Sequence, residues 1–225
     1  MLIKRRELKF ITYFIYYDEI VNWIKKNKYN FKKQYNDRLV NNIYFDSYSY
    51  DSFKENIFGS SEKTKVRYRW YEKFDESNHG SLEIKKRKNI FGFKEIFNIK
   101  NLQITKESDL KKIYDLIKIQ LDLKKRLYLT ARPYPTIINQ YSREYYIDFN
   151  ENFRITIDKK IKIYDQRLSS KINIKNKIYT PDFMVVEFKF NQNFNDEITD
   201  ICKNFPLRVS RNSKYVNAIR ASAGI

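Results

Sequence analysis

The stretch KTKVRYRWY, residues 63–71, alternates basic side chains with apolar or aromatic ones. Every second residue of its first seven is a cation: Lys63, Lys65, Arg67 and Arg69. Because successive side chains of a β-strand point to opposite faces, this pattern predicts a strand with one cationic face and one apolar face. A solvated strand face usually carries charges of both signs. Because the charged face of this strand carries only positive charge, we ask which anion these cations bind.

The whole chain is strongly basic. It has 225 residues, 45 of them Lys or Arg and 27 Asp or Glu, which gives a net charge of +18. We expect a single domain over residues 1–225, since hydrophobic residues make up 42% of the chain and can form a sizeable core. The charge favours an anionic partner, which could be nucleic acid, an anionic membrane or a polyanionic small molecule.

Several classes of site are excluded by composition. Cys202 is the only cysteine, so the chain can form no internal disulfide and no cysteine zinc cluster. His79 is the only histidine and lies in the polar loop ESNHGS, where we interpret it as a solvated loop residue, which leaves no histidine for a catalytic triad. Four glycines argue against a glycine-rich phosphate loop. No apolar run reaches the roughly 20 residues of a membrane span, and MLIKRRELKF is too charged for a signal peptide. We therefore expect a cytoplasmic protein, and any membrane coupling would run through a membrane-protein partner.

The remaining sequence is mostly strand-like. Runs rich in β-branched and aromatic residues predict strands near 5–14, 38–46, 63–74, 80–88, 92–99, 137–148, 153–164 and 182–190. Helical spacing is found near 18–28, 106–126, 195–205 and 211–222. About eight strands with helices between them indicate an α+β fold, a β-barrel-like domain with helices packed outside.

Other predicted strands also carry charge at alternate positions. Glu83, Lys85 and Arg87 share a face, as do Glu187 and Lys189. For one strand a solvated sheet face is the simplest interpretation. For several strands of a closed barrel, the charged positions would line a basic lumen. Because unpaired buried charges cost several kcal/mol each, such a lumen has to hold water and an anion. A chain of phosphates with Mg²⁺ or Mn²⁺ fits.

The ordered set RRELKF, NIYFDS, KTKVRYRWY, LEIKKR, YSREYY, FRITID, VVEFKF and NSKYVNAI resembles the VTC domain of polyphosphate polymerases. That family belongs to the triphosphate tunnel metalloenzymes, relatives of the CYTH triphosphatases. The resemblance runs from about Arg5 to Ile219. It implies an eight-stranded antiparallel β-barrel tunnel with a C-terminal helix at one tunnel end.

The resemblance also implies the site residues. Those in catalytic contact with phosphate would be Lys65, Arg67, Arg69, Lys85, Arg143, Arg154 and Lys214. Further substrate contacts would come from Lys9, Arg5, Arg87, Lys189 and Ser213. The carboxylates for a metal would be Glu187, Glu83 and Glu7.

The first of these motifs departs from the hydrolytic relatives. CYTH triphosphatases begin with Glu-x-Glu-x-Lys, whereas this chain has Arg5 in the first acidic position. Fewer lumen carboxylates give weaker support for two metals and a hydrolytic water. The resemblance thus favours a polymerase that moves the ATP γ-phosphate onto growing inorganic polyphosphate, with Mn²⁺ or Mg²⁺, and releases ADP.

Two alternatives remain open. One is a tripolyphosphate or nucleoside triphosphate hydrolase of the same fold, and the other is a non-catalytic module that binds polyphosphate or RNA. The cations alternate with glutamates on strands instead of gathering on one helix or loop, which argues against nucleic acid as the partner.

Overall fold

The computed structural model describes residues 5–89 and 91–224, without the side chains of Arg5, Phe91 and Gln192. Its contacts group into two compact units. Unit 1 takes in the residues up to Arg38 together with Tyr141–Ile161 and Pro181–Asn212. Unit 2 takes in Leu39–Gln140, Lys162–Thr180 and the residues from Ser213 onward. The expectation of one domain over residues 1–225 stays a prediction.

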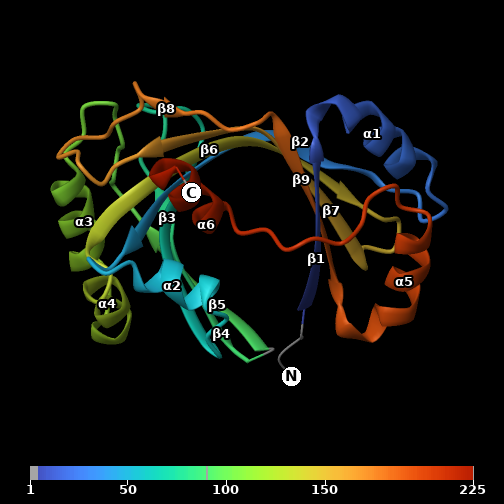
Figure 1. The fold of residues 1–225 in the computed structure, drawn as a ribbon, viewed down its shortest axis with the longest axis horizontal. Helices are drawn as coiled ribbons and strands as arrows, with labels where there is room; N and C mark the ends of the chain where they lie inside the picture. Colours follow the sequence, from blue (N-terminus) through green and yellow to red (C-terminus); the bar gives the residue numbers. More distant parts are fainter. Residues whose placement is uncertain (1–4, 90, 225) are drawn as a thin grey trace. The chain divides into compact units, whose positions relative to one another are not determined.

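The fold is α+β, as expected, and is built on an antiparallel sheet (Figure 1). Its strands are β1 (Arg5–Tyr13), β2 (Lys32–Asp46), β3 (Glu62–Tyr71), β4 (Gly80–Lys88), β5 (Phe91–Ile99), β6 (Tyr134–Ile147), β7 (Phe153–Asp165), β8 (Lys177–Ile178) and β9 (Phe183–Asn191). The strand order is β1-β9-β7-β6-β2-β3-β4-β5, with β8 on β7.

Two details of the sheet differ from the prediction. The sheet has nine strands instead of eight, because the two-residue strand β8 is too short to give a sequence pattern. The sheet is also not closed into a barrel, since in the described part of the chain the strand path ends at β1 and β5 without pairing them. All eight predicted strands are present at their expected places.

The helices include one that the sequence did not predict. They are α1 (Tyr17–Lys26), α2 (Asp51–Ile57), α3 (Leu110–Ile119), α4 (Leu123–Thr130), α5 (Asn195–Lys203) and α6 (Lys214–Ala223), with short 3-10 turns η1 (Phe14–Tyr16) and η2 (Gln192–Phe194). Asp46 at the end of β2 accepts hydrogen bonds from the backbone N–H groups of Ser52 and Phe53, at 2.9 and 3.2 Å. Helix α2 is therefore capped by a residue outside its own sequence, which local patterns do not reveal.

The predicted helix over 106–126 is two helices. Asp109 caps α3 by accepting a hydrogen bond from the Lys112 N–H, and Asp122 caps α4 by accepting one from the Lys125 N–H. Aspartate at an N-cap satisfies the free N–H groups of a new first turn. The second aspartate therefore starts a new helix where apolar spacing alone predicted continuation.

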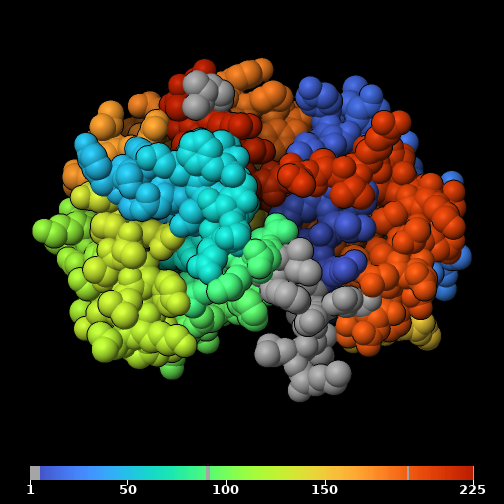
Figure 2. Space-filling view, turned by 60° about the horizontal axis from the view of Figure 1, so that its bottom comes forward, coloured from blue at the N-terminus to red at the C-terminus, as the bar shows by residue number. Residues whose placement is uncertain are grey.

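The core of unit 2 lies between β3, β4 and two helices. Val66, Tyr68 and Trp70 from β3 are buried in one cluster with residues of α3 and α4, such as Ile117 and Leu129. This confirms that the apolar positions of residues 63–71 form the helix-covered face, so the cationic positions lie on the other face. At the surface of the same unit, α6 borders α2 (Figure 2).

The core of unit 1 is largely aromatic. The rings of Phe10, Phe188 and Phe205 pack with centroid distances of 4.6 to 5.0 Å. Ile20 of α1 and Ile198 of α5 join the same buried cluster. The two helices thus cover the apolar positions of β1, β7 and β9 and leave the alternate, charged positions on the opposite face.

Candidate functional site

Three side-chain rows cross β3, β4 and β5 in unit 2. The first row is Lys65, Lys85 and Lys94, the second is Arg67, Glu83 and Ile96, and the third is Arg69, Ser81 and Asn98. We call these nine positions the cation rows. Like charges placed directly opposite each other on a sheet repel one another, so a row of three lysines favours the binding of an anion.

Glu83 is the one carboxylate among these nine described positions. Arg67 donates to Glu83 Oε2 from Nε at 2.8 Å and from Nη2 at 2.5 Å, and Lys94 Nζ donates to Oε1 at 2.9 Å. The Nη1 atom of Arg69 lies 3.5 Å from the same carboxylate. Burial tends to raise the pKa of Glu83, but Arg67, Arg69 and Lys94 outweigh it and hold that pKa below its usual range. Glu83 is therefore a fixed anion that holds three cations in place.

Lys94 is a member of this cluster that the sequence analysis missed. Burial, with the nearby charges of Arg67 and Arg69, lowers the pKa of Lys94 to about 8, although Glu83 opposes the shift. The signal that could have found it is the hairpin register, which sets Lys94 opposite Lys85. A predicted strand over 92–99 without its pairing gives no such information.

Both arginines are also held by neutral groups. Arg69 is 5% exposed, and its Nε donates to Asn42 Oδ1 at 2.8 Å. Asn42 in turn donates from Nδ2 to Asn139 Oδ1 at 2.8 Å. Arg67 Nη1 donates to the Tyr44 hydroxyl at 3.1 Å. The guanidinium planes are thus fixed before any ligand binds, which reduces the ordering needed on binding.

The start of α6 contacts Lys65. Lys65 Nζ donates to Ser213 Oγ at 2.8 Å, and the same oxygen accepts from the Val216 N–H as the N-cap of α6. Lys214 is the first residue of that helix and is half-buried. The structure therefore brings Ser213 to the first cation row, and Lys214 follows it as the first residue of α6. Arg87 is exposed and donates to the Asn89 carbonyl at 2.8 Å, so it stands apart from Glu83.

Unit 1 carries a second charged cluster, centred on Lys9 and Glu187. Lys9 Nζ lies 2.8 Å from Glu7 Oε1 and 3.4 Å from Glu187 Oε1. Lys189 Nζ lies 3.2 Å from the other Glu187 oxygen. Burial would lower the pKa of Lys9, but Glu187 and Glu7 outweigh it and raise that pKa above its usual value. Lys9 is therefore a permanently charged group bridging two carboxylates.

Arg143 in this cluster is neutralised by a residue that we did not predict for the site. Its Nε and Nη2 donate to the two carboxylate oxygens of Asp158 at 2.5 and 2.7 Å, and Asp158 is fully buried. Burial opposes the charge of Arg143, yet Asp158 raises the Arg143 pKa well above its usual value. Arg154 is exposed and lies opposite Lys189 in the strand register. Arg5 opens β1 opposite Asn191, and its side chain lies outside the described residues.

A family model for the VTC domain matches residues 4–223. The chain belongs to the VTC-domain family. The resemblance found in the sequence is thereby confirmed over nearly the whole chain. No curated protein matches the sequence.

Solved structures with the same fold as this VTC domain are distant in sequence. A putative adenylate cyclase from Vibrio parahaemolyticus is 12% identical, with a TM-score of 0.52 over 94% of this chain and 95% of that one. The putative adenylyl cyclase HpAC1 from Hippeastrum, described as having a dominant triphosphatase activity, is 12% identical, with a TM-score of 0.51 over 97% and 95%. The PH1819 protein from Pyrococcus horikoshii OT3 is 14% identical, with a TM-score of 0.50 over 96% and 99%.

The predicted metal ligands of the VTC domain differ in their surroundings. Among the described residues, no three His, Cys, Asp or Glu side chains are grouped to hold a metal. Glu83 and Glu187 each lie within 4 Å of three cations, and Glu7 lies with Glu187 at Lys9. Opposite Glu187, the Thr156 hydroxyl oxygen is buried without a hydrogen-bond partner in the described part of the chain. One or two carboxylates together with substrate phosphates are a common way to bind Mg²⁺, and Glu187 has a second carboxylate, Glu7, near it at Lys9, whereas Glu83 is the one carboxylate of the cation rows.

None of the described helices of this VTC domain is both long and apolar enough to cross a bilayer.

Proposed function

We propose that this VTC domain binds triphosphate and polyphosphate on the cation rows and transfers the γ-phosphate of ATP onto a phosphate chain. The observation that carries the proposal is the row of Lys65, Lys85 and Lys94 beside two arginines that share one carboxylate. A linear phosphate anion brings successive charges that can lie against successive rows. Its binding would remove the repulsion among the lysines, which favours such a ligand over a monovalent anion.

In the proposed reaction a terminal oxygen of the acceptor phosphate attacks the γ-phosphorus of ATP in line with the bridging oxygen to the β-phosphate. The new phosphoanhydride bond forms as the β–γ bond breaks, and ADP leaves with the electron pair. No covalent enzyme intermediate is required, because such transfers depend mainly on positioning and charge stabilisation.

The arginines are suited to that task. The guanidinium of Arg67 is fixed by Glu83 and Tyr44, and that of Arg69 by Asn42. A planar guanidinium can donate two parallel hydrogen bonds to phosphate, and a preset one needs no reorganisation as charge develops. Lys94 keeps its proton near neutral pH and would add a point charge to the same phosphates.

A divalent cation would be held by Glu187 with Glu7 and would supply Lewis-acid neutralisation of phosphate oxygens. Mn²⁺ and Mg²⁺ suit these oxygen ligands. In unit 1, Lys9 holds the carboxylates of Glu7 and Glu187 near each other, and Lys189 is a second cation beside Glu187. Lys9 and Lys189 can both bind phosphate oxygens by charge.

Hydrolysis is the second candidate, favoured by the dominant triphosphatase activity ascribed to the Hippeastrum relative. A hydrolase of this kind has to position water with a free carboxylate or a metal. In the cation rows both oxygens of Glu83 accept from cations, so Glu83 is a poor base for water, and a hydrolase would depend on the metal alone to position water.

Purified protein incubated with ATP and Mn²⁺ tests the proposal, with products separated by electrophoresis and stained for long phosphate chains. We expect polymer and ADP, and their loss in Arg67→Ala. The matched control is Lys88→Ala, since Lys88 is an exposed cation of β4 that pairs with Glu62. Free phosphate without polymer would assign the domain to the hydrolases. Displacement of labelled tripolyphosphate by single-stranded RNA at equal concentration would reject both activities in favour of an RNA-binding module.

A further inference from the structure

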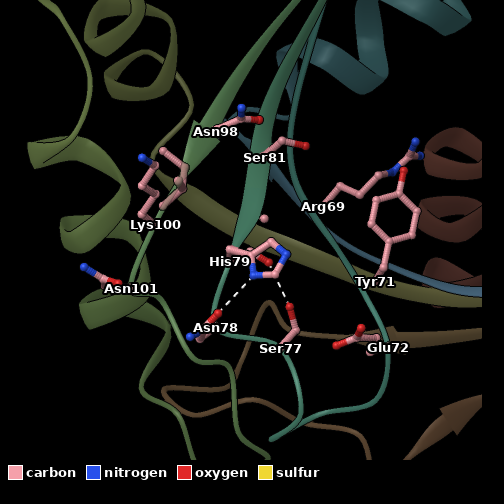
Figure 3. Close-up of a pocket in the computed structure, with 12 residues that line it drawn as sticks. Arg69, Tyr71, Glu72, Ser77, Asn78, His79, Ser81, Asn98, Lys100 and Asn101 are labelled. Carbon is pink, nitrogen blue, oxygen red and sulfur yellow. Dashed lines mark hydrogen bonds between the residues drawn. The ribbon is translucent and has the colours of Figure 1, made fainter.

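A pocket of about 560 Å³ adjoins the cation rows at the Arg69 end (Figure 3). Its volume is within the range of about 300–1,000 Å³ that is typical of small-molecule sites. Arg69 and Tyr71 come from β3, Ser81 and Asn98 from β4 and β5, and His79 from the loop before β4. The pocket belongs entirely to unit 2, and Arg69 is shared between it and the cation rows.

Positive charge falls steeply along the strands toward this pocket. The first cation row has three lysines, the second an arginine with its glutamate partner, and the third only Arg69 beside Ser81 and Asn98. Beyond the third row, Lys100 is the one further cation among the lining residues, and Glu72 in the same lining carries the opposite charge. A phosphate chain that continued in this direction would therefore leave its counter-charges behind.

The lining has the groups that a neutral, hydrogen-bonding ligand needs. The amides of Asn78, Asn98 and Asn101 and the hydroxyl groups of Ser77 and Ser81 offer donors and acceptors. Tyr71 and His79 also offer flat rings at this pocket (Figure 3). Amides and hydroxyls that pair with base edges and sugar hydroxyls, together with rings that stack on a base, are suited to a nucleoside.

The loop that carries the ring of His79 is fixed by its own hydrogen bonds. Ser77 Oγ donates to the His79 carbonyl at 2.9 Å, and the Asn78 carbonyl accepts from the Leu102 N–H at 2.8 Å. The His79 Nδ1 atom lies 2.9 Å from Asn78 Oδ1. The pocket is thus preformed on this side and does not need a ligand to order it.

We propose that this pocket binds the nucleoside of ATP while the triphosphate lies on the cation rows, with Arg69 at the junction. The proposal rests on the proposed function, because it takes ATP as the substrate. It assigns specificity between ATP and bare polyphosphate to the pocket, in particular to Tyr71 and Asn98.

The test compares ATP with inorganic tripolyphosphate, by calorimetry, on wild type and three variants. Asn98→Leu removes an amide at nearly constant volume, and Tyr71→Ala removes a ring. Asn176→Leu is the matched control, since Asn176 is exposed, in the same unit and outside the pocket lining. We expect the ATP dissociation constant to rise about fivefold or more in the two pocket variants, as lost hydrogen bonds or stacking would give. The tripolyphosphate constant should stay within about twofold, which also reports an intact fold.

The outcomes separate the two proposals. An unchanged ATP affinity in both pocket variants, or an equal loss for ATP and tripolyphosphate, would overturn the nucleoside site and leave the proposed function standing. Pocket-dependent ATP binding without any polymer or ADP would uphold the nucleoside site and overturn phosphoryl transfer. A wild type that binds neither ligand would overturn both.

Discussion

The two charged clusters use the same residue types in opposite proportions. In the cation rows of unit 2, Glu83 is the one carboxylate among five cations. In unit 1, three carboxylates, Glu7, Asp158 and Glu187, lie with three cations, Lys9, Arg143 and Lys189. Counted over these described residues, the first cluster carries an excess of positive charge, whereas the second is balanced.

This difference indicates that the cluster in unit 2 binds a ligand, whereas the cluster in unit 1 stabilises the fold. Like charges placed side by side on a sheet repel one another, and an anion that binds between them relieves that repulsion, so the excess positive charge of the cation rows favours an anionic ligand. A balanced, buried cluster such as Arg143 with Asp158 satisfies itself and contributes to the fold. A metal ion would add positive charge to the balanced cluster and would raise the affinity of that cluster for phosphate.

The largest effect should come from Arg67→Ala, which tests the unbalanced cluster. It removes a preset guanidinium, and we expect a loss of about 3 kcal/mol or more of transition-state stabilisation, roughly a hundredfold or more in turnover. Polymer formation from ATP measures it. Lys88→Ala, a cation of the same sheet on the opposite face, should keep wild-type turnover. If both variants kept it, the cation rows would have no part in the chemistry.

The next largest effect should be on stability, in the balanced cluster. Asp158→Asn leaves the buried Arg143 guanidinium with a neutral partner, and we expect a loss of about 3 kcal/mol in the free energy of unfolding. Urea titration measures it. Glu83→Gln should lower the free energy of unfolding by less, because an anion from solution can neutralise the cations that Glu83 leaves. Saturating tripolyphosphate should restore most of the Glu83→Gln loss and little of the Asp158→Asn loss. Equal rescue of the two variants would contradict the distinction between the clusters.

A smaller effect should follow from Glu187→Gln. The carboxylate holds the metal, whereas the lysines and arginines hold phosphate, so the Mn²⁺ concentration for half-maximal activity should rise about tenfold or more. The affinity for metal-free tripolyphosphate should change little. A Mn²⁺ titration of turnover, with calorimetry in a chelator, checks both. An unchanged metal requirement would move the metal site to Glu7 or Glu83.

The smallest effect concerns one proton on Lys94. Its pKa of about 8 means that above pH 8 the free protein has lost much of this charge. A bound phosphate anion favours the charged form and raises the pKa, so binding at pH 8.5 should take up a fraction of a proton. Affinity for tripolyphosphate should accordingly fall as pH rises through 8. Calorimetry in two buffers of different ionisation enthalpy measures the uptake, and Lys94→Arg should abolish it. Equal uptake in that variant would place the titrating group elsewhere.

Local patterns predicted most of the fold because period-two alternation carries its own information. Residues 63–71 show which side chains face the core, and the structure buries Val66 and Trp70 as expected. The same patterns failed at α2, which is capped by Asp46 from a preceding strand, and at Asp122, which divides a continuous apolar stripe into two helices. They also gave no means to decide that the sheet stays open.

The sequence by itself determined the strands, the sign of their charged faces and the family. Alternation and composition are local properties, and they do not depend on which strands are neighbours. Only the tertiary structure decided which charges meet, because pairing register is a relation between distant segments. That register sets Lys94 beside Glu83 and leaves the three lysines abreast, while the β6 and β7 strands bring Arg143 to Asp158. The pocket beside Arg69 likewise exists only where β3, β4 and β5 end together.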